Sequence, residues 1–185
     1  MAQLSTKKFF PVALMVGILA ALYIIVGMKL NLILWVPFIS WALFFIAGSK
    51  YSRLPKEIIG LTGGLVFAAL LLWLLPTFIN LFGANWGLPI LVFLVAFLIV
   101  MLEVTNWFEL APAYFFSFAG FFALLFGGSV PAQMTWGNIF TFWYLLMIGL
   151  GLGVITSFLR SRILDLLKVP LEERQTIFDK EKRII

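Results

Sequence analysis

The chain has 185 residues, of which 63% are hydrophobic and 11% are charged. Soluble domains rarely carry such a composition, so the sequence predicts an integral membrane protein with room for about six spans of roughly 20 residues. It contains no cysteine and no histidine, which excludes disulfides, thiolate chemistry, haem ligation and the commonest zinc and copper sites. The formal charge of +5 therefore indicates membrane topology rather than nucleic-acid binding.

Six apolar stretches follow one another along the chain. They are residues 9–27, 30–48, 58–82, 87–104, 108–127 and 138–159. Basic residues precede the first stretch and follow the second and the sixth, and of the 13 Lys and Arg residues Lys29 alone falls on the opposite side. The positive-inside rule therefore predicts an all-α protein with six transmembrane helices and both termini in the cytoplasm.

Two segments of the chain resemble each other, residues 38–45 (FISWALFF) and residues 115–122 (FFSFAGFF). Three spans separate the equivalent positions, so the two copies would cross the bilayer in opposite directions. The sequence thus predicts a 3+3 inverted repeat of residues 9–82 and 87–159, followed by a charged tail at 160–185. The alternative is a chance match between two phenylalanine-rich segments.

The repeated motif places Ser40 and Ser117 near the middle of the second and fifth spans. Their hydroxyls, with carbonyls freed by Pro37 and Pro112 inside the helices, are predicted to line a narrow passage between phenylalanine walls. The candidate pathway residues are Ser40, Phe44, Phe45, Ser117, Phe121, Phe122, Asn31 and Asn106. The alternative is that the motif only packs helices, because small residues allow close approach and serine bonds back to its own helix.

Glycines spaced four residues apart occur in the third and sixth spans. They are Gly60 and Gly64, and Gly149 and Gly153. This spacing is typical of helix-packing faces, either inside one chain or between the subunits of a homo-oligomer.

Three charged residues flank the ends of spans, Lys29 on the outer side and Glu103 and Glu109 on the cytoplasmic side. One interpretation is that they filter charged solutes at the two mouths of a passage. The other is that the glutamates are solvated or paired with cytoplasmic basic residues, and the same is expected of Glu57.

The tail at 160–185 alternates apolar and charged residues. It is predicted to lie on the inner leaflet or to dock a partner in a membrane complex, with a plain stop-transfer tail as the alternative.

The stretches 40–48 and 112–128, together with the length and the span pattern, resemble the small YcdZ-like inner-membrane proteins of bacteria. That family has no assigned biochemical activity. The resemblance implies a location in the bacterial cytoplasmic membrane and supplies no catalytic residues.

No nucleophile, base or metal cluster can be assembled from the polar residues, so we expect neither an enzyme nor a cofactor. Two functions remain. The first is an oligomeric channel or facilitator for a small neutral solute such as urea, ammonia or a dissolved gas, since no ATP motif or buried proton relay is visible. The second is a structural or assembly subunit of a larger membrane complex.

Overall fold

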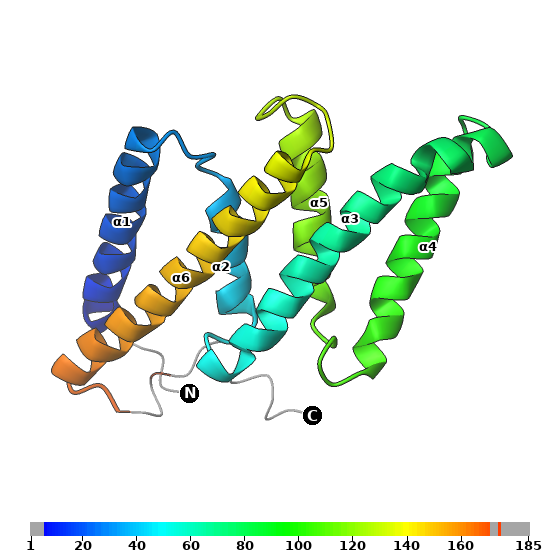
Figure 1. Ribbon diagram of the computed structural model, residues 1–185. Coiled ribbons are helices and arrows are strands. Elements are labelled where there is room, and N and C mark those ends of the chain that lie inside the picture. Colours follow the sequence, from blue (N-terminus) through cyan, green and yellow to red (C-terminus); the bar gives the residue numbers. More distant parts are fainter. Residues whose placement is uncertain (1–5, 171–173, 175–185) are drawn as a thin grey trace.

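The computed structural model describes residues 6–170 and residue 174, which form six α-helices and two short 3-10 helices (Figure 1). In chain order they are α1 (Thr6–Lys29), α2 (Val36–Ile46), η1 (Tyr51–Arg53), α3 (Leu54–Phe82), α4 (Gly87–Met101), η2 (Leu102–Val104), α5 (Ala111–Phe126) and α6 (Trp136–Leu166). The described part contains no strand. The predicted all-helical class and the six helices are confirmed.

Four of the helical segments are long and apolar enough to cross a membrane: α1, α3 extended by η1, α4 extended by η2, and α6. The other two are shorter than predicted, since α2 has 11 residues and α5 has 16. At 1.5 Å per residue they are about 16 and 24 Å long, whereas the hydrocarbon layer is about 30 Å thick. The expectation that residues 30–48 and 108–127 form full-length spans is therefore wrong.

Proline and glycine set the lengths of α2 and α5. Pro37 and Pro112 lie in the first turn of their helices, where a missing N–H costs no hydrogen bond. The predicted breaks inside these helices are therefore absent. The chain leaves α2 through Gly48, with φ of +93°, and leaves the end of α5 through Gly128, with φ of +76°, a conformation that suits glycine.

The helices form two groups, and each group combines two helices from one half of the chain with one helix from the other half. In one group α2 runs along α6 and α1 covers α6; in the other α3 runs along α5 and α4 covers α3 (Figure 1). The groups meet where α2 contacts α5 and where α3 contacts α6. Figure 1 shows α1 and α4 at opposite flanks, with the long, tilted α3 and α6 between them.

Successive helices alternate in direction, so the start of α1 and the end of α6 lie at the same end of the molecule (Figure 1). The connections that follow α2 and α4 lie there too. This end therefore carries Lys50, Arg53, Lys56 and Arg160, whereas Lys29 closes α1 at the other end. We call these the basic end and the Lys29 end.

The largest buried cluster joins α2, α3, α5 and α6, and its biggest side chains, Phe44, Phe121 and Phe142, are fully buried. A second cluster joins α3, α4 and α5 around Leu71, Ile99 and other apolar residues. Large apolar side chains remain exposed on the outer helices α1 and α4, which suits contact with lipid rather than water.

Candidate functional site

The glycines of α6 lie against α2. A Cβ atom at Gly149 would overlap the carbonyl oxygen of Pro37 and the Oγ of Ser40, and a Cβ at Gly153 would lie 2.8 Å from side-chain atoms of Phe44. The two helices approach this closely only because these positions have no side chain.

The glycines of α3 make the same kind of contact with α5. A Cβ atom at Gly60 would lie 2.5 Å from the Cβ of Ala113, and one at Gly64 would overlap the carbonyl oxygen of Tyr114. Both pairs of glycines therefore lie at helix contacts within one chain.

Hydrogen bonds donated by side chains of α2 hold this helix to α6. The Ser40 hydroxyl is fully buried and donates to the Leu146 carbonyl at 2.6 Å, with the Pro37 carbonyl farther away at 3.3 Å. One residue on, the Trp41 indole N–H donates to Thr156 Oγ1 at 3.1 Å, and that hydroxyl donates to the Leu152 carbonyl at 2.8 Å. For Ser40 this geometry favours the packing interpretation.

The second serine of the repeat has different surroundings. Ser117 is also fully buried, but its Oγ has no hydrogen-bond partner in the part of the chain that the structure describes. The same holds for the Tyr114 hydroxyl, one turn earlier on α5, and for both carboxyl oxygens of Glu57 on α3. The polar groups that lack partners thus gather on α3 and α5, while those between α2 and α6 are bonded.

We expect the two serines to differ in their effect on stability. Ser40→Ala removes the bond to α6 and should lower the free energy of unfolding by about 0.6–1 kcal/mol. Ser117→Ala removes no bond and should stay within about 0.5 kcal/mol of the parent or stabilise it. Thermal unfolding of both purified variants in one detergent tests this, and a larger loss for Ser117→Ala would contradict it.

The phenylalanines of the motif divide into two classes. Phe44 and Phe121 are fully buried, and the Phe121 ring lies 5.6 Å from that of Phe142 on α6. Phe45 and Phe122 are partly buried on the sides of α2 and α5. Apolar side chains therefore fill the interior around the two serines.

The remaining candidate residues lie at opposite ends of the molecule. Asn31 and Lys29 are exposed at the turn after α1, where Asn31 adopts a φ of +51°. Asn106, Glu103 and Glu109 are exposed at the basic end. The structure thus separates the predicted mouth charges by the length of the bundle.

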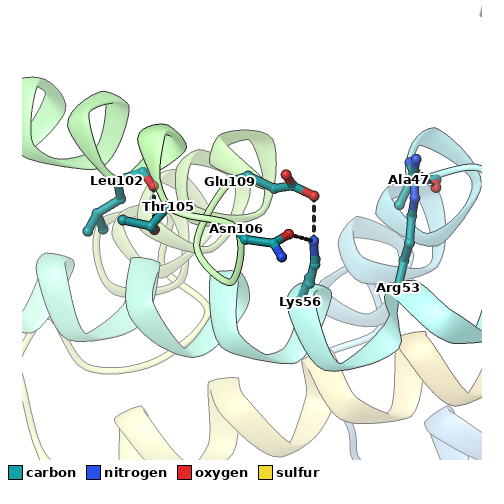
Figure 2. A network of polar contacts seen from close by, with 7 residues as sticks. All are labelled: Ala47, Arg53, Lys56, Leu102, Thr105, Asn106 and Glu109. Atoms are coloured by element: carbon teal, nitrogen blue, oxygen red, sulfur yellow. Dashed lines mark hydrogen bonds and ion pairs between the residues drawn. The ribbon is translucent and has the colours of Figure 1, made fainter.

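Lys56 connects α3 to the segment before α5 (Figure 2). Its Nζ donates to Asn106 Oδ1 at 2.8 Å and to Glu109 Oε1 at 2.6 Å. In the same view Arg53 extends to the end of α2, where its Nη1 donates to the Ala47 carbonyl at 2.8 Å. Glu109 is therefore paired with a basic residue, which is the second of the two interpretations of its charge.

The structure corrects the expectation for Glu57, which is neither solvated nor hydrogen-bonded. Its side chain is fully buried and its carboxyl oxygens accept no hydrogen bond, while the nearby Arg53 and Lys56 donate to other groups. The signal for its burial was the spacing to Gly60, Leu61 and Gly64, which places Glu57 on the inner face of α3. Its charge and its basic neighbours masked that signal.

Two hollows on the molecule are lined by apolar side chains. One of about 670 Å³ lies between α3 and the start of α6, with Leu65, Trp73 and Trp136 in its wall. Another of about 320 Å³ lies between α2 and α5, with Ala42 and Ala119 facing it. Within the described residues, no group of three or more Asp and Glu side chains is placed to hold a metal ion.

Comparison with known proteins gives a family without an activity. No curated protein matches the chain. No solved structure matches it either. The similarity to YcdZ-like proteins stays a prediction. Residues 13–160, most of the chain, match the family described as "Protein of unknown function (DUF1097)", and the chain therefore belongs to the DUF1097 family.

Proposed function

We propose that this protein is a membrane facilitator for a small neutral solute that forms hydrogen bonds, such as urea or ammonia. It is built as a 3+3 inverted repeat of α1–α3 and α4–α6, and its passage follows the contact between α3 and α5. The observation that carries this proposal is the set of buried polar groups without partners on these two helices, Glu57, Tyr114 and Ser117.

The contacts of the two halves support the inverted repeat. The residue whose carbonyl meets Gly149 is Pro37, three positions before Ser40; the one whose carbonyl meets Gly64 is Tyr114, three positions before Ser117. The third helix of each half packs on the second helix of the other half. Matching contacts of this kind are expected when a two-fold axis in the membrane plane relates the two halves, as it does in transport proteins with inverted repeats.

The chemistry of the buried groups without hydrogen-bond partners supports a polar solute. A buried polar group without a partner costs about 1–3 kcal/mol, so such groups are normally bonded to protein, water or a ligand. Two hydroxyls and a carboxyl offer both donors and acceptors, which suits urea or ammonia better than a dissolved gas. The Ser40 hydroxyl, by contrast, already donates to the Leu146 carbonyl.

The apolar surface and the basic end support the location. Four helical segments are long enough to cross a bilayer, and the cations gather at one end, so the positive-inside rule puts that end and both termini in the cytoplasm. We place the protein in the bacterial inner membrane as a homo-oligomer. The apolar hollow between α2 and α5, with Ala42 and Ala119 in its wall, allows another subunit to approach.

Stopped-flow light scattering on proteoliposomes tests the function. We expect the protein to accelerate entry of urea or ammonia over empty vesicles, and Ser117→Leu to remove that increase by filling the passage. Ser40→Ala is the matched control, because it changes the equivalent serine on the other helix pair and should keep the flux. Size-exclusion chromatography of both variants establishes that they are folded and oligomeric, and Ser117→Val serves if the leucine variant is not.

Two outcomes would contradict the proposal. Equal flux in Ser117→Leu and the parent would mean that no passage runs along the contact between α3 and α5. No acceleration of any hydrogen-bonding solute by folded protein, together with a stoichiometric partner in mild-detergent extracts, would favour the subunit of a larger complex.

A further inference from the structure

The connection between α4 and α5 meets the basic end of the contact between α3 and α5. Its last residue, Leu110, has its carbonyl oxygen 3.4 Å from a Cβ atom placed at Gly60, the first glycine of α3. Lys56 lies one turn before Gly60, and Figure 2 shows two side chains of the connection reaching towards it. The connection therefore lies where a passage along α3 and α5 would open to water. We call its residues 103–109 the flap.

The flap contributes little to the buried interior of the protein. All of its residues are exposed, including the large apolar side chains of Val104, Trp107 and Phe108. Part of its hydrogen bonding is internal to the connection, since the Phe108 N–H donates to the Thr105 carbonyl and the Thr105 hydroxyl donates to the Leu102 carbonyl. Segments with few buried contacts separate from the rest of a protein at a low cost in free energy, so the flap can move without disturbing α3 or α5.

Two side chains of the flap bond to α3 at one atom, the Nζ of Lys56. This nitrogen donates to Asn106 Oδ1 at 2.8 Å and to Glu109 Oε1 at 2.6 Å. The ion pair is partly exposed, with 23% of the Lys56 side chain and 52% of the Glu109 side chain accessible, and such pairs contribute little to stability. A weak contact centred on one atom suits a latch that has to open.

We propose that the flap closes the basic end of the solute passage and that Lys56 latches it. The proposal rests on the proposed passage along α3 and α5 and adds a means of regulating it. When the bonds from Lys56 break, the flap lifts and small molecules reach the buried hydroxyls of Tyr114 and Ser117. Glu109 then acts at the mouth by holding the flap, and not by filtering charged solutes.

Thiol labelling of the full-length protein in detergent tests the flap without any assumption about the solute. The chain contains no cysteine, so Ser117→Cys introduces a single, buried thiol. We expect Lys56→Met to raise its rate of reaction with a small methanethiosulfonate about two- to fivefold, the range for the loss of an exposed ion pair. Ser40→Cys, in the contact between α2 and α6, is the matched control and should react at an unchanged rate. Arg53→Met removes a cation from the same end that donates to Ala47 and not to the flap, and it should also change nothing.

Exchange of the two charges separates the latch from a general loosening of the fold. Lys56→Glu alone should speed the labelling, and adding Glu109→Lys should return the rate towards that of the parent. Equal labelling in Lys56→Met and the parent, or an equal rise in Arg53→Met, would overturn the proposal. Thermal unfolding checks that each variant is folded, and Glu109→Gln replaces Lys56→Met if that variant is not.

Solute flux through proteoliposomes of the same variants separates this proposal from the proposed function. Faster labelling together with faster flux in Lys56→Met would support both. Faster labelling of folded protein that carries no solute would support the flap as a cover of the contact between α3 and α5 and would contradict the facilitator. Faster flux with unchanged labelling would overturn the flap, because access to Ser117 would not depend on it.

Discussion

A leucine at Gly149 is expected to force α2 and α6 apart and to lower the stability of the protein by about 3 kcal/mol or more, as overpacking of a close contact does. Even a Cβ atom there would overlap the Pro37 carbonyl and the Ser40 hydroxyl, so the larger side chain must also break the bond from Ser40 to Leu146. Backbone atoms do not rotate away as a flexible side chain does.

Thermal unfolding in detergent measures this effect. For a chain of this size about 3 kcal/mol corresponds to a fall in Tm of roughly 6–12 °C. The matched control is Gly151→Leu, because Gly151 lies on the same helix with no atom within 4 Å of a Cβ placed there. We expect the control to stay within about 0.5 kcal/mol of the parent. Helix propensity favours leucine over glycine, so equal losses would mean that a leucine is unfavourable on both sides of α6 and that the contact with α2 does not explain the effect.

The glycine contact also shows what the sequence could predict. Spacing alone identified Gly60, Gly64, Gly149 and Gly153 as positions of close approach, because a stripe of missing side chains has few other uses in an apolar helix. The sequence did not predict which helices these glycines contact. Which helix each stripe meets depends on the exchange of α3 and α6 between the halves, which is a property of the tertiary fold.

The lengths of α2 and α5 illustrate a second limit. Residues 30–35 and 108–110 continue the apolar stretches, so the hydropathy pattern predicted helices that begin earlier than α2 and α5 do. Pro37 and Pro112 were visible in the sequence, but they were read as interior breaks rather than as first-turn residues. Asn31 adopts a positive φ in the turn after α1, and the chain becomes helical again only at Val36.

The difference between Ser40 and Ser117 lies beyond a single sequence. Both occupy the same place in a repeated motif, and both are fully buried. Only the position of a carbonyl on the neighbouring helix distinguishes them, because Leu146 presents one to Ser40 and no described residue accepts from Ser117. The motif therefore predicts burial but not which of the two serines has a hydrogen-bond partner.

Glu57→Met is expected to raise the stability of the protein while removing the solute flux that we propose. A buried carboxyl without a partner is unfavourable, and replacing it with an apolar side chain of similar length should stabilise the fold by about 1–3 kcal/mol. Methionine offers the solute no strong hydrogen bond, so the flux should fall. Glu57→Gln keeps donors and acceptors at the same place and should retain part of the flux.

The opposite signs of the two effects separate function from structure. A carboxyl kept for packing would lower stability when removed, whereas one kept for a solute lowers flux and leaves the fold more stable, as strained functional groups do. Glu103→Gln, an exposed carboxyl at the same end, is the control and should change neither quantity. If Glu57→Met lost stability and kept its flux, Glu57 would be a structural residue with a partner that forms in the membrane, and the passage would need another polar lining.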